Sequence, residues 1–194
     1  MYPVTAHRTL CRHFADLLSY PDGATRQKAA DCAALLRNLY PEAAEPLCGF
    51  VNFLEQQDAA RVEEIFTATF DLQPACHPYV GYQLCGESQQ RTMFLIKLQQ
   101  LYNQHGFTAG TELPDHLSTM LRFIGTVADH DCQQELVSDG LLPALEKLLQ
   151  GLDQGDHPYV ELLSALRIFL TGTVDCRAKP FSVIRPKETC SCST

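Results

Sequence analysis

This sequence lacks the features that would mark a membrane-spanning, secreted or nucleic-acid-binding protein. No stretch approaches the roughly 18 uninterrupted apolar residues that a membrane helix needs. Residues 1–18 contain neither a continuous apolar core nor a small-residue cleavage site, so no secretory signal is indicated. Lysine and arginine number 15 against 23 aspartates and glutamates, and no basic cluster is available for nucleic acid. We predict a reduced, soluble, cytoplasmic protein, and with a net charge of -8 its charged partner should be basic.

The usual metal-binding patterns are also missing. The nine cysteines are an odd number without a secretory signal, which does not indicate a disulfide scaffold. Cys76, His77 and Cys85 form an internal cluster whose spacing matches no common zinc pattern, and Cys190 and Cys192 form a C-x-C pair near the C-terminus. We predict no metal ligands. A metal-binding helical protein that uses these thiols stays open as an alternative.

Signatures of the common enzyme classes are absent too. The sequence contains no GxGxxG, no phosphate-binding loop, no GxSxG and no HExxH. Cys85, Asp115 and His116 are the residue types of a nucleophile, an orienting acid and a base, but the sequence does not place them together. We predict that the protein is not an enzyme and has no catalytic residues. A small hydrolase or nucleotide-using enzyme is the alternative of another class.

What the sequence does contain is helical periodicity in an ordinary globular composition. Of 194 residues, 45% are apolar and 20% are charged, which is enough for one sizeable core. Apolar residues recur three and four positions apart, and alternation typical of strands occurs only at 181–184. We predict an all-α single-domain bundle of about 8–10 helices over residues 1–172, with a flexible tail at 173–194. The predicted helices span 6–19, 25–40, 46–56, 58–70, 88–105, 114–127, 131–138, 142–152 and 158–170. Thr25 and Asp58 are the expected N-caps of the second and fourth of them.

Two segments stand out from this pattern. The helix 88–105 is apolar around more than half of its circumference, which is typical of a helix at the centre of a bundle. The segment 71–86 has two prolines and two glycines and no clean period, and we predict a long irregular loop. Loops of this length in compact domains are often functional. The helix after it is expected to begin near Pro114, with Asp115 in its first turn.

A long loop across a bundle would leave an apolar groove that accepts a peptide with a basic head and an apolar body. The candidate aromatic walls are Tyr79, Tyr82 and Phe107. The candidate negative rim consists of Glu87, Glu112 and Asp115. The structural alternative is that the aromatic residues are ordinary core, that Asp115 charges a helix N-terminus and that His116 simply packs.

Several motifs resemble the family of molybdoenzyme maturation chaperones, the all-helical proteins of the TorD, DmsD and NarJ kind. The resemblance lies mainly in residues 66–117, where GES-x-x-R covers 86–91 and ELPDHL covers 112–117. Thr69-Phe70-Asp71, Tyr79 and the stretch from Leu101-Tyr102 to Gly106-Phe107 also fit, as do LSYP at 18–21 and HPY at 157–159. GES-x-x-R combined with ELPDHL is most similar to the nitrate reductase delta-subunit branch.

The resemblance implies a chaperone that binds the N-terminal leader of a molybdenum-containing catalytic subunit. That leader carries a twin-arginine signal or a remnant of one. The chaperone would hold the apo-subunit until the molybdenum cofactor is inserted, without itself binding a cofactor permanently. Asp115 and His116 occupy the motif associated with leader binding, and His116 is expected to add pH dependence near pH 6.5. The neighbouring motif positions, with Tyr82 from the predicted groove, complete the predicted peptide-binding set: Tyr79, Tyr82, Glu87, Arg91, Glu112 and Pro114.

The resemblance leaves two points about the partners open. Nitrate reductase is the expected client, whereas a sulfoxide, N-oxide or other oxyanion reductase is the alternative, because the loop CHPYVGYQ departs from the pattern of the nitrate branch. A monomer and a domain-swapped dimer are both compatible with a helical bundle that carries a long loop.

Overall fold

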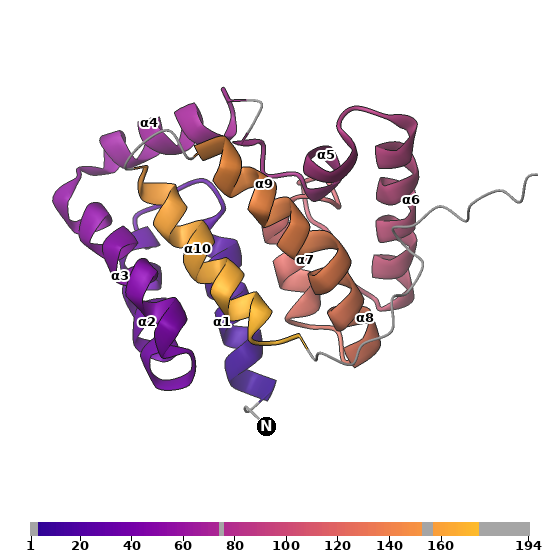
Figure 1. Ribbon diagram of the computed structural model, residues 1–194, viewed down its shortest axis with the longest axis horizontal. Coiled ribbons are helices and arrows are strands. Elements are labelled where there is room, and N and C mark those ends of the chain that lie inside the picture. The colour runs from indigo at the N-terminus through magenta and orange to yellow at the C-terminus, as the bar shows by residue number, and fades with distance from the viewer. Residues whose placement is uncertain (1–3, 74–75, 153–156, 175–194) are drawn as a thin grey trace, which may run out of the picture.

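The protein is a bundle of helices without a sheet in the part of the chain that the structure describes (Figure 1). That part comprises residues 4–73, 76–152 and 157–174 of a computed structural model. The predicted all-α fold is therefore confirmed. The helices are α1 (Val4–Leu17), α2 (Thr25–Leu39), α3 (Pro41–Gln56), α4 (Ala59–Phe70), α5 (Val80–Cys85), α6 (Gln89–Gln104), α7 (Leu117–Ile124), α8 (His130–Glu135), a π-helical segment (Leu136–Leu141), α9 (Leu142–Leu152) and α10 (Pro158–Thr171).

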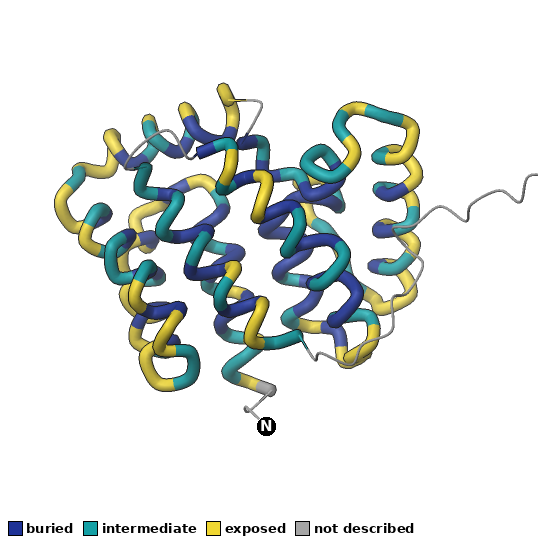
Figure 2. Tube along the Cα trace, viewed as in Figure 1, coloured by how far each residue is buried: buried dark blue, intermediate teal, exposed yellow. Residues whose placement is uncertain are grey.

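The core lies around α10, which packs against α3 on one side and α9 on the other (Figure 1). Helix α1 packs against α2 and α7. Buried residues form the inward faces of these helices, and exposed residues lie on the outside (Figure 2). Tyr159 of α10 is fully buried, and its ring contacts those of Phe50, Phe66 and Phe70 at centroid distances of 4.8 to 6.0 Å. This aromatic cluster joins α3 and α4 to α10.

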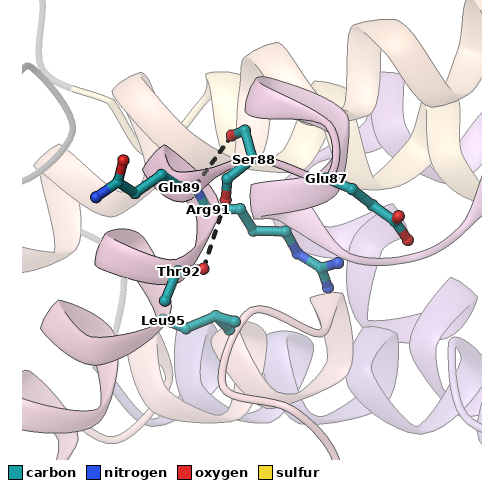
Figure 3. A pocket seen from close by; sticks show the side chains of 6 residues that line it. All are labelled: Glu87, Ser88, Gln89, Arg91, Thr92 and Leu95. Atoms are coloured by element: carbon teal, nitrogen blue, oxygen red, sulfur yellow. Dashed lines mark hydrogen bonds between the residues drawn. The ribbon is translucent and has the colours of Figure 1, made fainter.

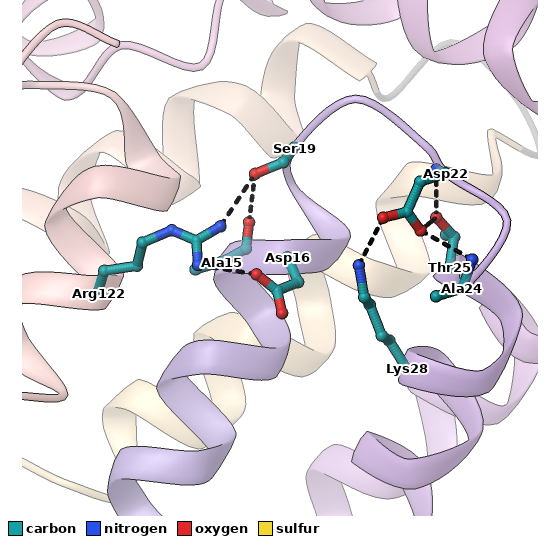
Figure 4. A network of polar contacts seen from close by, with 8 residues as sticks. All are labelled: Ala15, Asp16, Ser19, Asp22, Ala24, Thr25, Lys28 and Arg122. Atoms are coloured by element: carbon teal, nitrogen blue, oxygen red, sulfur yellow. Dashed lines mark hydrogen bonds and ion pairs between the residues drawn. The ribbon is translucent and has the colours of Figure 1, made fainter. Parts of the chain in front are cut away.

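The turn between α1 and α2 is fixed by polar contacts on both sides (Figure 4). Arg122 of α7 pairs with Asp16 at 2.8 Å, which ties α7 to the end of α1. Asp22 accepts from the Ala24 backbone N–H at 2.9 Å and pairs with Lys28 at 2.8 Å. Thr25 was expected as the N-cap of α2. It is instead the first helical residue, and its hydroxyl accepts from the Asp22 backbone N–H.

The boundaries of the predicted helices are correct where a cap is local in the sequence. Asp58 caps α4 by accepting from the Arg61 backbone N–H at 2.7 Å, as predicted. Helix α3, by contrast, begins five residues before the predicted start. Pro41 sits at its first turn, where a missing N–H costs nothing, and Pro46 is accommodated inside the helix.

Helix α6 was expected at the centre of the bundle, and this prediction is wrong. It lies at one edge of the molecule, beside α5 (Figure 1). Only Phe94, Leu98 and Tyr102 are buried, whereas Met93 and Ile96 are 50% and 47% exposed. The residues 93–96 are consecutive and therefore point in all directions, so a helix packed on one side leaves some of them in solvent.

Three further expectations need correction. The segment 71–86 is not wholly irregular, because it contains α5, a helix of six residues that is too short to show a period. Helix α7 begins at Leu117 and not at Pro114, and it ends at Ile124, before Val127. The helices predicted at 131–138 and 142–152 are joined by the π-helical segment into one continuous run. The strand-like alternation noted at 181–184 and the tail from 175 onward lie outside the described residues.

Candidate peptide-binding site

The site is organised by one antiparallel bridge between two loops. Tyr79, just before α5, pairs with His116, just before α7. The Val80 backbone N–H donates to the Asp115 carbonyl at 2.7 Å, and the Leu117 N–H donates to the Pro78 carbonyl at 2.8 Å. Neither residue is helical: Asp115 lies in a turn, and the backbone of His116 is extended. The bridge brings Tyr79 to the ELPDHL motif although the two bridge residues are more than thirty positions apart.

Asp115 is completely buried and forms an ion pair with Arg91. Its Oδ2 accepts from Arg91 Nε at 3.0 Å, while its Oδ1 has no hydrogen-bond partner among the described residues. The Arg91 side chain is 16% exposed. The prediction that Asp115 lies on an exposed rim is therefore wrong. A buried carboxylate is stable only with a paired cation, so this contact ties the start of α6 to the bridge.

Gly81, which the sequence motifs did not single out, makes this arrangement possible. A Cβ atom at this position would lie 2.8 Å from Asp115 Oδ2 and 2.8 Å from the Phe94 ring. Real Cβ atoms do not approach other atoms so closely, so only glycine lets α5 come this near to Asp115. An isolated glycine inside a short helix gives no such signal at the level of sequence.

Arg91 also lies over two aromatic rings. Its guanidinium carbon is 5.4 Å from the centroid of Tyr79 and 5.7 Å from that of Tyr82. Both distances are within the range of a cation–π interaction. The structure thus brings four of the predicted residues, Tyr79, Tyr82, Arg91 and Asp115, into one cluster.

An open concavity of about 440 Å³ adjoins this cluster at the start of α6 (Figure 3). Glu87 is exposed at its edge, and the Glu87 and Arg91 side chains extend to the same side of it. Ser88 caps α6 by accepting from the Arg91 backbone N–H at 3.4 Å. The concavity is lined by Glu87, Ser88, Gln89, Arg91, Thr92 and Leu95.

His116 is buried, with 7% of its surface exposed. Its Nδ1 accepts from the Ser118 backbone N–H at 3.2 Å and so caps α7. Its ring stands edge-on to Tyr79 at 5.3 Å. Burial, with a smaller effect from Arg122, lowers the pKa of His116 to about 4. The expected titration near pH 6.5 is therefore corrected: His116 is neutral throughout the physiological range.

We predict that His116 makes the protein acid-sensitive. The neutral ring is favoured in the folded state, because the folded pKa of about 4 lies below the unfolded value of 6.5. Protons therefore favour the unfolded state, and stability falls as the pH drops below 6.5 towards 4. Between pH 7 and 4.5 the loss through His116 should be about 2–3 kcal/mol. Urea unfolding at both pH values should show a smaller loss for His116→Asn, which retains a capping oxygen. Equal losses in both proteins would contradict this role.

Glu112 lies on the surface near Tyr79, as the predicted negative rim requires. Burial raises the pKa of Tyr79, and the charges of Glu112, Asp115 and Asp71 raise it further, while Arg91 opposes them. Glu112 and Asp71 are both exposed and form no ion pair with the described residues. Asp71, at the end of α4, was not predicted as a site residue. It is found only because the fold returns this helix end to the vicinity of Tyr79.

Pro114 and Phe107 both contact the buried residue Tyr102. The Pro114 carbonyl accepts from the Tyr102 hydroxyl at 2.7 Å. This bond holds the loop before α7 against α6. The Phe107 ring packs on those of Tyr102 and Phe123 at 5.1 and 5.4 Å. Phe107 was expected as an aromatic wall of the groove; it is half-buried, and these ring contacts join it to the core.

The cysteines do not assemble a chemical site in the part of the chain that the structure describes. No group of three or more His, Cys, Asp or Glu residues there could hold a metal ion. Cys76 is buried and Cys85 is exposed, while His77 contacts the Tyr82 ring at 5.4 Å. Cys190 and Cys192 lie outside the described residues. Asp115 and His116 have Arg91 and Ser118 as partners, which does not match a Cys–His–Asp arrangement.

A comparison with protein families identifies the chain. The family model described as the nitrate reductase delta subunit matches residues 34–165. The chain belongs to this family. The probable nitrate reductase molybdenum cofactor assembly chaperone NarJ of Bacillus subtilis is 32% identical over 152 residues, covering 77% of this chain and 82% of the relative. NarJ of Escherichia coli K12, also described as such a chaperone, is 28% identical over 82% of this chain and 68% of the relative.

The fold also has a solved counterpart. A crystal structure described as a putative redox enzyme maturation protein, from Archaeoglobus fulgidus, superimposes with a TM-score of 0.58 at 24% identity. The match covers 84% of this chain and 93% of that one. The predicted bundle and family are thus confirmed. The two NarJ relatives are chaperones and not enzymes, in line with the prediction made for this chain. Within the described residues, no helix combines the length and apolarity needed to cross a membrane.

Proposed function

We propose that this delta-subunit family member is a cytoplasmic assembly chaperone of a nitrate reductase. It binds the N-terminal leader of the apo catalytic subunit and holds that subunit until its molybdenum cofactor has been inserted. Export or membrane attachment is thereby delayed. The molybdenum cofactor is inserted into the client subunit, so the chaperone needs no permanent site for it. The observation that carries the proposal is the cluster of Tyr79, Tyr82, Arg91 and Asp115, which joins both sequence motifs beside an open concavity.

The residues of the cluster have two different tasks in this proposal. Tyr79 and Tyr82 are half-buried, and Glu87 and Glu112 are exposed, so these side chains can touch a peptide. Asp115 and His116 are buried and act as positioning residues. Asp115 holds Arg91 over the rings of Tyr79 and Tyr82. His116 caps the start of α7, and its ring packs edge-on against that of Tyr79. Loss of Asp115 would therefore weaken binding through Tyr79 and Tyr82.

The test is calorimetric titration with the N-terminal leader peptide of the nitrate reductase catalytic subunit. A scrambled peptide of the same composition is the control for charge alone. Leader peptides from sulfoxide and N-oxide reductases, used as competitors, decide which client is preferred. The proposal requires that the nitrate reductase leader binds more tightly than the scrambled peptide and the competitors. Equal affinity for all of them would contradict it.

We predict that this binding weakens modestly with salt. Glu87 and Glu112 are exposed, so their attraction to a basic leader is screened when the Debye length falls from about 10 Å at 0.1 M to about 3 Å at 1 M. Buried apolar contacts should supply most of the affinity and are not screened. The dissociation constant should rise by a few fold over this range, chiefly through slower association. Titrations at several salt concentrations measure this, and complete insensitivity would count against the acidic rim.

A further inference from the structure

The large apolar side chains that remain exposed fall into two groups. Met93 and Ile96 lie on α6, a helix with no acidic residue. The other three each lie beside an acid. Leu72, 74% exposed, follows Asp71, and Leu113, 45% exposed, follows Glu112. Tyr20, 58% exposed, donates its hydroxyl to Glu63 at 3.2 Å.

This second group belongs to one region of the surface. The Tyr20 ring stands edge-on to Phe66 of α4 at 5.7 Å, which places it on the helix that ends at Asp71. The charge of Asp71 acts on the hydroxyls of both Tyr20 and Tyr79. Glu112 acts on Tyr79 from the other side of the bridge. The residues therefore follow one another from the turn after α1, past the end of α4, to the loop before α7.

The segments that carry these side chains are held by hydrogen bonds and ion pairs. The turn that carries Tyr20 is held by the contacts of Asp16 and Asp22 (Figure 4). Leu72 follows the end of α4, where its backbone N–H donates to the Thr67 carbonyl at 3.1 Å. The loop before α7 is held by the bridge and by the bond from Tyr102 to Pro114. A partner would meet these side chains already positioned, which lowers the entropy lost on binding.

We infer that Tyr20, Asp71, Leu72, Tyr79, Glu112 and Leu113 form a docking strip for an extended segment of the client in which basic residues are adjacent to apolar ones. This inference rests on the proposed function and extends the site beyond the concavity at α6. One acid–leucine pair lies shortly before Tyr79 in the chain and the other shortly before its bridge partner His116, and each can match a cation–apolar pair on the partner. A purely apolar partner would desolvate Asp71 and Glu112 without compensation. A second copy of this acidic chain would be repelled.

The first arm of the test measures the apolar part of the strip. Full-length Leu72→Ser/Leu113→Ser should bind the nitrate reductase leader peptide about 10-fold more weakly, because two apolar contacts are lost. The matched control is Met93→Ser/Ile96→Ser, which removes two exposed apolar side chains from α6 and should bind within about twofold of the unaltered protein. All four substitutions are at exposed positions, and thermal unfolding checks that each variant is folded.

The second arm measures charge. Asp71→Asn/Glu112→Gln should weaken binding about 3- to 10-fold at low salt and remove most of the salt dependence. Glu146→Gln, an exposed acid on α9, is the control and should change nothing. A synthetic peptide of repeated Arg-Leu-Ser units serves as a second probe that contains only the predicted chemistry.

The outcomes separate the two proposals. If the leader binds and the strip variants bind it as well as the α6 and Glu146 controls do, the docking strip is wrong while the proposed function stands. If only the Arg-Leu-Ser peptide binds, and the strip variants lose it, the strip stands and leader binding fails. If neither peptide binds the unaltered protein, both proposals are overturned.

Discussion

Arg91→Met should lower the free energy of unfolding by about 3 kcal/mol or more, because it leaves the fully buried Asp115 carboxylate without its cation. For a domain of this size the melting temperature should fall by roughly 6–12 °C. Leader affinity should fall as well, since the cation over Tyr79 and Tyr82 is lost. Urea unfolding followed by circular dichroism measures the first effect, and peptide titration below the unfolding transition measures the second.

Two further variants make this result specific. Arg61→Met removes an ion pair with Glu64 whose side chains are 53% and 66% exposed, so it should cost at most about 1 kcal/mol. Adding Asp115→Asn to Arg91→Met removes the uncompensated charge, so part of the lost stability should return. The role assigned to the pair is wrong if Arg91→Met is no more destabilising than Arg61→Met, or if the double variant is less stable than the single one.

Gly81→Val should destabilise the fold by about 3 kcal/mol and weaken leader binding. Even a Cβ atom at this position overlaps Asp115 Oδ2 and the Phe94 ring at 2.8 Å, and the branched side chain adds two more methyl groups. Helix α5 must then move away, which carries Tyr82 off Arg91. The effect on binding should therefore accompany the effect on stability.

Gly23→Val is the matched control. Nothing lies within 4 Å of a Cβ atom at Gly23, which is exposed in the turn before α2. This substitution should change the free energy of unfolding by less than about 1 kcal/mol. If Gly81→Val unfolds at the same urea concentration as Gly23→Val, the close approach of α5 to Asp115 is not a constraint on the fold. Unchanged leader affinity in Gly81→Val would show that the position of Tyr82 does not matter for leader binding.

The membership of the site could be predicted more fully than its geometry. Tyr79, Arg91 and Asp115 were expected near one another because their motifs resemble those of one family, and Tyr82 was expected as a wall of the same groove. Their exposure was not predictable. An aspartate is normally assigned to the surface, since burying a charge is costly without a partner. Arg91 is 24 residues away along the chain, so its pairing with Asp115 is a property of the folded protein.

The same distinction applies to the residues that were missed. Gly81 matters only because α5 lies against the Asp115 carboxylate, and Asp71 only because the end of α4 lies near Tyr79. Neither contact can be predicted from local sequence patterns. Sequence motifs therefore indicated one end of the binding surface, whereas the exposed leucines beside Asp71 and Glu112 were recognisable only once their burial was known.

The sequence by itself determined that this chain is helical, where α4, α9 and α10 lie, and to which family it belongs. These properties depend on spacing, on capping side chains such as Asp58 and on short motifs, all of which act within a few residues. Only the tertiary structure decided that α6 lies at the edge, that Asp115 and His116 are inside, and that the charge of Asp71 acts on Tyr79. Burial and pairing depend on which helix packs against which, and that is set by contacts between residues far apart in the chain.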